Sequence, residues 1–493
     1  MKTPQYLFEL IKSLSEKEKN IILSGWKVKC SSSKCIYTGL FNELNKLDVY
    51  DEKKFLNDSR NQRFLKNFSY NKHYLYKKLL NSISDYLCDD GTTETILIEE
   101  LKKIKYLISK GLYKQAKPLI LKAEKISLKE EYYQEYIKII NYKKLVTLSM
   151  NKGSKLFQLT NEIYDDIEKS QKALEEINTA SRLNNNLFLL YNSNGYYSEK
   201  YFNKELSSIL RHEFYKNENK LSVDAGVYYY GDKFIHAMNG NDFEKSYAYA
   251  KKRYELVSKN KFYSRKYPVT ILASLADLLH VLLCQKRLKK FDKYFKDFCC
   301  LNLIDYSAKK SWFYEKYFFE MQRCILKSEF EFAGKIYERF KAELKEYPSV
   351  NYYSNSIMVD LLILFSYSFL KNKNYTESLG IINMIPVDEF KGLSYSLFYS
   401  ISILKIINYY KLDFPQNTLS EIKSLKRYLK LKDKLTETDV QLFELFFETF
   451  KQNKSRIEKN RLQKFYFFLK KIKPDESLSE FLFDFEELVK SEL

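Results

Sequence analysis

The chain has 493 residues, more than a single hydrophobic core usually serves, so its length predicts several domains or an open repeat array. Its formal net charge of +20 would suit a polyanionic partner, but only 12 of the 83 basic residues are Arg, the side chain best suited to phosphates and base edges. This composition argues against a dedicated reader of nucleic-acid sequence.

Helical periodicity runs through the whole chain. Apolar residues recur every three or four positions, and strand-like alternation bounded by turn residues is almost absent. Only 12 Gly and 7 Pro are present to interrupt helices. We therefore expect an all-α protein.

Residues 1–90 are predicted to form a compact helical module. Four helices are expected, at 3–23, 37–47, 52–68 and 71–87, and the sequence SLSEKEK favours a break within the first of them. Ser69 is the expected N-cap of the fourth helix. A helix, a short polar turn and a basic second helix also describe a helix-turn-helix, so a DNA-binding module is a rival interpretation.

A basic stretch without any acidic residue covers residues 59–82. Lysine and arginine alternate there with Phe and Tyr, a pattern that can neutralise phosphates and stack on bases. The same pattern also fits a helix with a solvated lysine face, and this second interpretation is favoured because the charge is mainly lysine. The candidate nucleic-acid contacts, within 59–84, are Arg60, Arg63, Lys66, Lys72, His73, Lys77 and Lys78.

A helical-repeat signature appears next, in KGLYKQAKPLILKAEK. Gly111 permits a tight turn, Tyr113 plugs the end of a helix hairpin, and Ala116 and Ala123 let neighbouring helices approach closely. This segment resembles the second half of a tetratricopeptide repeat. The resemblance implies an α-solenoid of antiparallel helix hairpins, and its weaker copies centre on Phe243, Phe330 with Ala333, and Tyr375.

The copies are evenly spaced when their aromatic residue is used as a marker. With Tyr197 and Leu288 as weaker markers, the steps are 42 to 46 residues, and an eroded copy is expected near Lys155. Because this step exceeds the 34 residues of the standard repeat, helices of about 18 residues are expected. The repeats should occupy residues 91–450.

Residues 451–493 are predicted to close the array with two capping helices. The first is strongly basic, the second is strongly acidic, and Pro474 separates them. Antiparallel docking would pair their charges and cover the last apolar face.

Catalytic and targeting signals are weak throughout the chain. No phosphate-binding glycine loop, H-E-x-x-H motif or nucleophile elbow occurs, and the four His are far apart.

The seven Cys are scattered without a C-x-x-C pair, as is typical of reduced thiols in a cytoplasmic protein. The N-terminus has no uninterrupted apolar stretch, and the run near 359–370 is too short for a bilayer. We expect no enzyme, cofactor, metal site, secretory signal or membrane span.

These patterns favour a non-enzymatic cytoplasmic adaptor that binds a protein or peptide on a helical-repeat surface rich in Tyr. The alternative is a regulator in which the repeats sense a partner and the N-terminal module binds nucleic acid.

Overall fold

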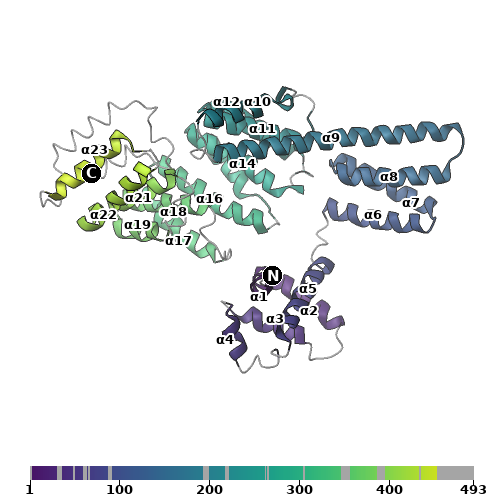
Figure 1. The fold of residues 1–493 in the computed structure, drawn as a ribbon, viewed down its shortest axis with the longest axis horizontal. Coiled ribbons are helices and arrows are strands. Elements are labelled where there is room, and N and C mark those ends of the chain that lie inside the picture. The colour runs from purple at the N-terminus through teal and green to yellow at the C-terminus, as the bar shows by residue number, and fades with distance from the viewer. Residues whose placement is uncertain are drawn as a thin grey trace. The chain divides into compact units, whose positions relative to one another are not determined.

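The computed structural model is all-α (Figure 1). Its described part contains 21 α-helices and no strand, and most consecutive helices pack against each other. This architecture confirms the predicted fold class. The structure describes residues 3–29, 36–47, 50–58, 64, 67–86, 92–192, 199–216, 221–260, 263, 266–303, 306–345, 356–385, 395–431 and 435–451.

The N-terminal helices surround one small core. Leu7 and Ile11 of the first helix, Phe41 of the third, and Leu75 and Leu79 of the fifth are fully buried together. The indole nitrogen of Trp26 donates a 2.6 Å hydrogen bond to the hydroxyl of Ser82 and so ties the second helix to the fifth. The helices are α1 (Thr3–Ser13), α2 (Glu16–Lys29), α3 (Ile36–Lys46), α4 (Glu52–Asn57) and α5 (Phe68–Tyr86).

Two local features move the helix boundaries from their predicted places. The expected break in the first helix is real: the Glu18 carboxylate accepts from the Ser15 backbone at 2.7 Å, while the Ser15 hydroxyl accepts from the Glu18 backbone at 3.3 Å. This capping box starts α2. The prediction of Ser69 as an N-cap was wrong. Helix α5 begins at Phe68, because the carbonyl of Asn67 accepts the hydrogen bond that opens the helix.

A second group of helices begins with α6 (Thr93–Ser109), α7 (Tyr113–Lys129) and α8 (Tyr133–Met150), in which α6 and α8 both pack on α7. Their shared core includes Leu97, Ile104, Ile120 and Ile139, all at most 1% exposed. The hairpin between α6 and α7 is the one the sequence predicted.

The hairpin expected near Lys155 is present, because Tyr136 and Ile140 of α8 pack against Ile163 of the next helix, but that second helix is much longer than predicted. Gly153 has the positive φ of a turn, +84°, and the chain then forms a single helix of 39 residues, α9 (Ser154–Asn192). No Gly or Pro interrupts this segment, so nothing in the backbone opposes a continuous helix. The marker Tyr197 lies outside the described residues.

Five hairpins follow α9 and α10. Each consists of a long first helix and a second helix that returns beside it. The expectation of about 18 residues per helix fits most of them, but α15, α17 and α19 are shorter. The helices are α10 (Glu199–Leu210), α11 (Val223–Asn239), α12 (Phe243–Lys259), α14 (Pro268–Cys284), α15 (Leu288–Cys299), α16 (Tyr306–Leu326), α17 (Ala333–Leu344), α18 (Ser356–Lys371), α19 (Tyr375–Asn383), α21 (Tyr395–Lys411) and α22 (Pro415–Leu431), followed by α23 (Glu437–Lys451).

Seven described turns between helices share one geometry. In each, one residue has a φ between +53° and +70°, and the next residue donates its backbone N–H to the carbonyl five positions earlier at 2.8 to 3.0 Å. This is the Schellman arrangement, which satisfies the last carbonyls of a helix while reversing the chain. The residues with positive φ are Gly111, Glu131, Asn241, Lys286, Ser328, Lys373 and Asp413.

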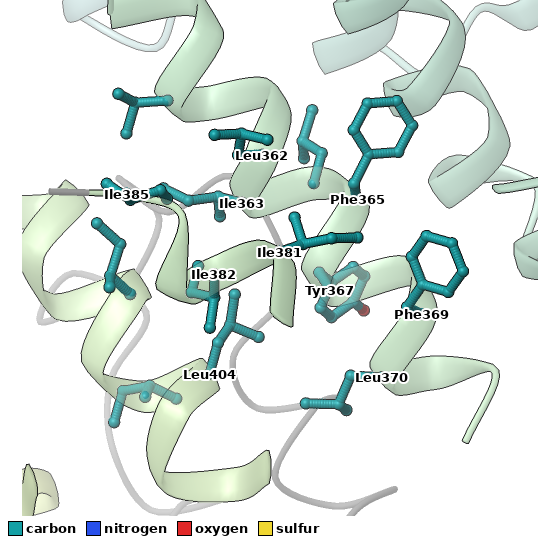
Figure 2. Close-up of a cluster of buried hydrophobic side chains, with 14 of the residues drawn as sticks. Leu362, Ile363, Phe365, Tyr367, Phe369, Leu370, Ile381, Ile382, Ile385 and Leu404 are labelled. Carbon is teal, nitrogen blue, oxygen red and sulfur yellow. The ribbon is translucent and has the colours of Figure 1, made fainter. Parts of the chain in front are cut away.

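The largest core runs from α16 to α23. Figure 2 shows part of it, where Ile382 of α19 lies near Leu404 of α21, and Phe365 of α18 and Ile381 of α19 belong to the same cluster. All four side chains are at most 2% exposed. Burial of this continuous apolar face is what joins successive hairpins, because no single hairpin could cover its own face.

The first helices of the hairpins form a continuous layer. Helix α11 contacts α14, α14 contacts α16, α16 contacts α18, and α18 contacts α21 (Figure 1). Each second helix lies against its own first helix, and α12, α15, α17 and α19 also contact the first helix of the next hairpin. We call this row of α11, α14, α16, α18 and α21 the first-helix layer.

Contacts divide the chain into two units, Met1–Thr179 and Ala180–Leu493, with the boundary inside α9. The predicted boundary near residue 90 lies outside the described residues, as do residues 452–493 of the predicted capping helices, so both stay predictions. None of the described helices combines the length and apolar composition needed to cross a membrane.

Candidate functional site

The predicted nucleic-acid contacts are only partly within the described residues. Arg60, Arg63 and Lys66 lie outside them. The other four candidates, Lys72, His73, Lys77 and Lys78, all lie on α5.

Lys72 is buried rather than presented to solvent. It is 4% exposed, and its ammonium lies 2.9 Å from both carboxylate oxygens of Glu52. The same ammonium lies 4.6 Å from the centre of the Phe68 ring, which adds a cation–π contact. Lys72 therefore joins α5 to α4, and its charge is already neutralised within the module.

The remaining candidates lie next to a row of tyrosine rings. His73 and Lys77 are exposed, while half-buried Lys78 has its ammonium 4.9 Å from the ring centre of Trp26 and 5.5 Å from that of Tyr37. The ring of Tyr74 stacks on that of Tyr37 at 4.4 Å and on that of Tyr70 at 6.3 Å. Tyr37 on α3 took no part in the sequence-based prediction, because nothing in the sequence shows that α3 lies beside α5.

The predicted repeat residues lie at the hairpin turns and their interfaces. Gly111 has a φ of +70°, and Ala116, Ala123 and Ala333 are at most 1% exposed. The marker aromatics Tyr113, Phe243, Phe330 and Tyr375 are half-buried at or next to the start of second helices. The positions three residues after the markers at 113, 243, 288, 330 and 375 are all buried: Ala116, Ser246, Phe291, Ala333 and Ser378.

A buried carboxylate holds the start of the second unit together. Asp232 of α11 is fully buried and accepts hydrogen bonds from the Tyr215 hydroxyl at 2.6 Å and from the Asn184 amide at 2.7 Å. Burial raises the pKa of Asp232 to about 6, although both hydrogen bonds favour the charged form. This network connects α9, α11 and the 3₁₀ turn at Glu213–Lys216.

An ion pair next to it links α12 with α14. The guanidinium of Arg253 pairs with Asp277, and both side chains are largely buried. A Cβ atom at position 231 would lie 3.3 Å from the guanidinium carbon, so Gly231 of α11 leaves the space that Arg253 fills. Burial raises the pKa of Asp277 even with this counter-charge present.

Further carboxyl groups lie along the first-helix layer. Burial, and then the charge of Asp277, raises the pKa of Glu315 on α16 to about 8. Burial alone raises the pKa of Asp360 on α18 to about 7. His280 on α14 is an exposed residue, and burial lowers the pKa of its imidazole. The raised pKa values keep Glu315 and Asp360 partly protonated near neutral pH, so these carboxyl groups can donate as well as accept hydrogen bonds.

A hollow of about 450 Å³ lies between α9 and α10. Leu183, Leu190 and Ile209 line it with apolar side chains, and Arg182 and His212 add polar groups. Within the described residues, no three His, Cys, Asp or Glu side chains are placed to hold a metal ion.

Comparison of the chain with protein-family models, curated proteins and solved structures finds no match. The carboxyl groups at 232, which is buried, and at 277, 315 and 360, which are half-buried, were not singled out from the sequence. Acidic residues on helices are usually solvated, and their pairing depends on the tertiary structure.

Proposed function

We propose that this protein is a non-enzymatic adaptor that binds a protein or peptide partner along the first-helix layer. The observation that carries the proposal is the continuity of that layer, in which each first helix contacts the next. Repeated hairpins joined in this way present a long surface, which suits an extended partner.

The chemistry of the layer also suits peptide recognition. His280 is exposed and Val269 of the same helix is 51% exposed, while Asp277 of this helix and Glu315 of α16 are half-buried. Alternating apolar and hydrogen-bonding groups can recognise side chains and backbone of a bound chain. We propose that the hairpins are tetratricopeptide-like, with longer steps, and that the partner is met in the cytoplasm, as the cysteine pattern of the sequence predicts.

Site-specific photo-crosslinking tests this function. A photoreactive amino acid replaces Val269 or His280 on α14, and matched controls carry it at exposed Lys251 on α12 or Lys289 on α15. We expect positions 269 and 280 to label the same partner in a native extract, with and without nuclease, and the controls to label it much less. Equal labelling from all four positions, or labelling lost with nuclease, would contradict an adaptor that binds on this layer.

A further inference from the structure

We propose that the exposed face of α5 is a binding surface for single-stranded nucleic acid, on which tyrosine rings stack with bases and lysines contact phosphates. This is a separate function from partner binding on the first-helix layer, and it concerns other residues of the chain.

The face is defined by helical geometry. With 100° per residue, Tyr70, His73, Tyr74, Lys77 and Asn81 fall on the side of α5 opposite the buried Leu75 and Leu79, and all five are exposed. We call these five residues the α5 face. It carries aromatic, cationic and amide groups and no carboxylate, so its charge is complementary to a phosphate backbone.

The rings of the face are held in position before any ligand binds. Tyr74 stacks on Tyr37 with an angle of 30° between the rings, and Tyr70 stacks on Tyr74 with an angle of 27°. Tyr70 nevertheless remains 63% exposed and Tyr74 41% exposed. Tyr70, at the end of this row, is supported by Tyr74 and otherwise mostly exposed, so its ring loses little entropy when a base stacks on it.

The cations have distinct roles. Lys77 is exposed and has no described acidic partner on α5, so it can contact phosphate directly. Lys78 is held over the rings of Trp26 and Tyr37 and places its charge beside the stack. Lys72 is neutralised by Glu52 and contributes no phosphate contact.

The ligand should be single-stranded and recognised with little sequence preference. Bases in a duplex are already stacked and paired, so a row of side-chain rings can reach them only in an unpaired strand. The face has no Arg, Gln or acidic side chain of the kind that reads base edges, and its single described amide is Asn81.

The test measures binding of fluorescein-labelled 12-nucleotide oligothymidylate and oligouridylate to the full chain, between 50 and 200 mM salt. A duplex of the same length is the third probe. We expect both single strands to bind more tightly than the duplex. The ratio between the DNA and the RNA probe shows which of the two is preferred.

Matched substitutions separate the α5 face from the general positive charge of the protein. Tyr70→Ala and Tyr74→Ala should each weaken binding about fivefold or more, because each removes one stacking ring. Tyr70→Trp should retain the affinity. The control is Tyr106→Ala on α6, since Tyr106 is also 63% exposed and also has a lysine, Lys110, near its ring. This control should bind as the unaltered protein does.

Salt dependence tests the phosphate contact. Lys77→Ala should lower the slope of log affinity against log salt by about 0.7, the value for one contact with a single strand, and exposed Lys105→Ala should leave it unchanged. Three results would each overturn the proposal: no binding at 50 mM salt, equal effects of the α5 and α6 substitutions, or a duplex bound as tightly as the single strands. Circular dichroism of each variant checks that the helices are retained.

Discussion

The ammonium of Lys72 lies 2.9 Å from each carboxylate oxygen of Glu52, and only 4% of this lysine is exposed. The two residues are 20 positions apart, and the pair fixes α4 against α5. A sequence that suggested a phosphate contact at Lys72 thus encodes an internal ion pair, whose importance for the fold can be measured.

Removing the counter-charge of Lys72 should destabilise the N-terminal module. Glu52→Gln leaves a buried ammonium without its carboxylate, and we expect a loss of about 1–3 kcal/mol in the free energy of unfolding, reduced by the partial exposure of Glu52. Urea denaturation followed by Trp26 fluorescence measures it in a Trp312→Phe background. Glu168→Gln breaks a solvent-exposed pair with Lys172 and should leave the stability almost unchanged. The interpretation is wrong if the two variants behave alike.

A bulky side chain at a buried contact between helices tests the predicted register of the first repeat. Ala116 is 0% exposed between neighbouring helices, so Ala116→Phe should cost about 1–3 kcal/mol of stability. Lys117→Ala, on the exposed side of the same helix, should have almost no effect. Thermal unfolding of both variants provides the measurement, and equal shifts in Tm would show that the register is misplaced.

The shared turn geometry predicts opposite effects of substitution at two hairpins. Gly111 has a φ of +70° with open space around it, so Gly111→Ala should cost about 1 kcal/mol through backbone strain alone. Lys286 adopts a similar φ of +53°, so Lys286→Gly should raise stability by a few tenths of a kcal/mol, up to about 1. The urea concentration at the midpoint of unfolding is measured for each variant and compared with that of the unaltered protein. A stabilising alanine at 111 would rule out the left-handed turn.

The raised pKa of Glu315 predicts a stability that falls with rising pH. Its folded pKa of about 8 lies above the ordinary value of 4.5, so the folded state holds this proton more tightly than the unfolded state. The contribution of this group to stability is then greatest below about pH 4.5 and is lost as the pH rises through about 8. Glu315→Gln should flatten the profile in this window and be more stable than the unaltered protein at pH 8. Exposed Glu331→Gln serves as control, and an unchanged slope in the Glu315→Gln variant would contradict the assignment.

The sequence by itself determined the helical class and the position of most hairpin turns. The markers at 243, 288, 330 and 375 each come two residues after a residue with positive φ. A tight turn between two helices fixes the short distance from the turn residue to the start of the second helix, and the local sequence encodes this distance. The sequence-based prediction failed on the length of α9, which continues from residue 154 to 192 instead of ending after about 18 residues, because no Gly or Pro interrupts it.

The tertiary structure decided which polar side chains are paired and which stay exposed. Lys72 and Lys77 lie on one helix and look alike in sequence, yet one is buried against Glu52 and the other is exposed. Asp277 and Glu315 likewise influence each other only because α14 packs against α16. Local periodicity places a residue on one face of its helix. The helix that covers this face comes from a distant part of the sequence, and that helix determines whether the residue is buried and which opposite charge it meets.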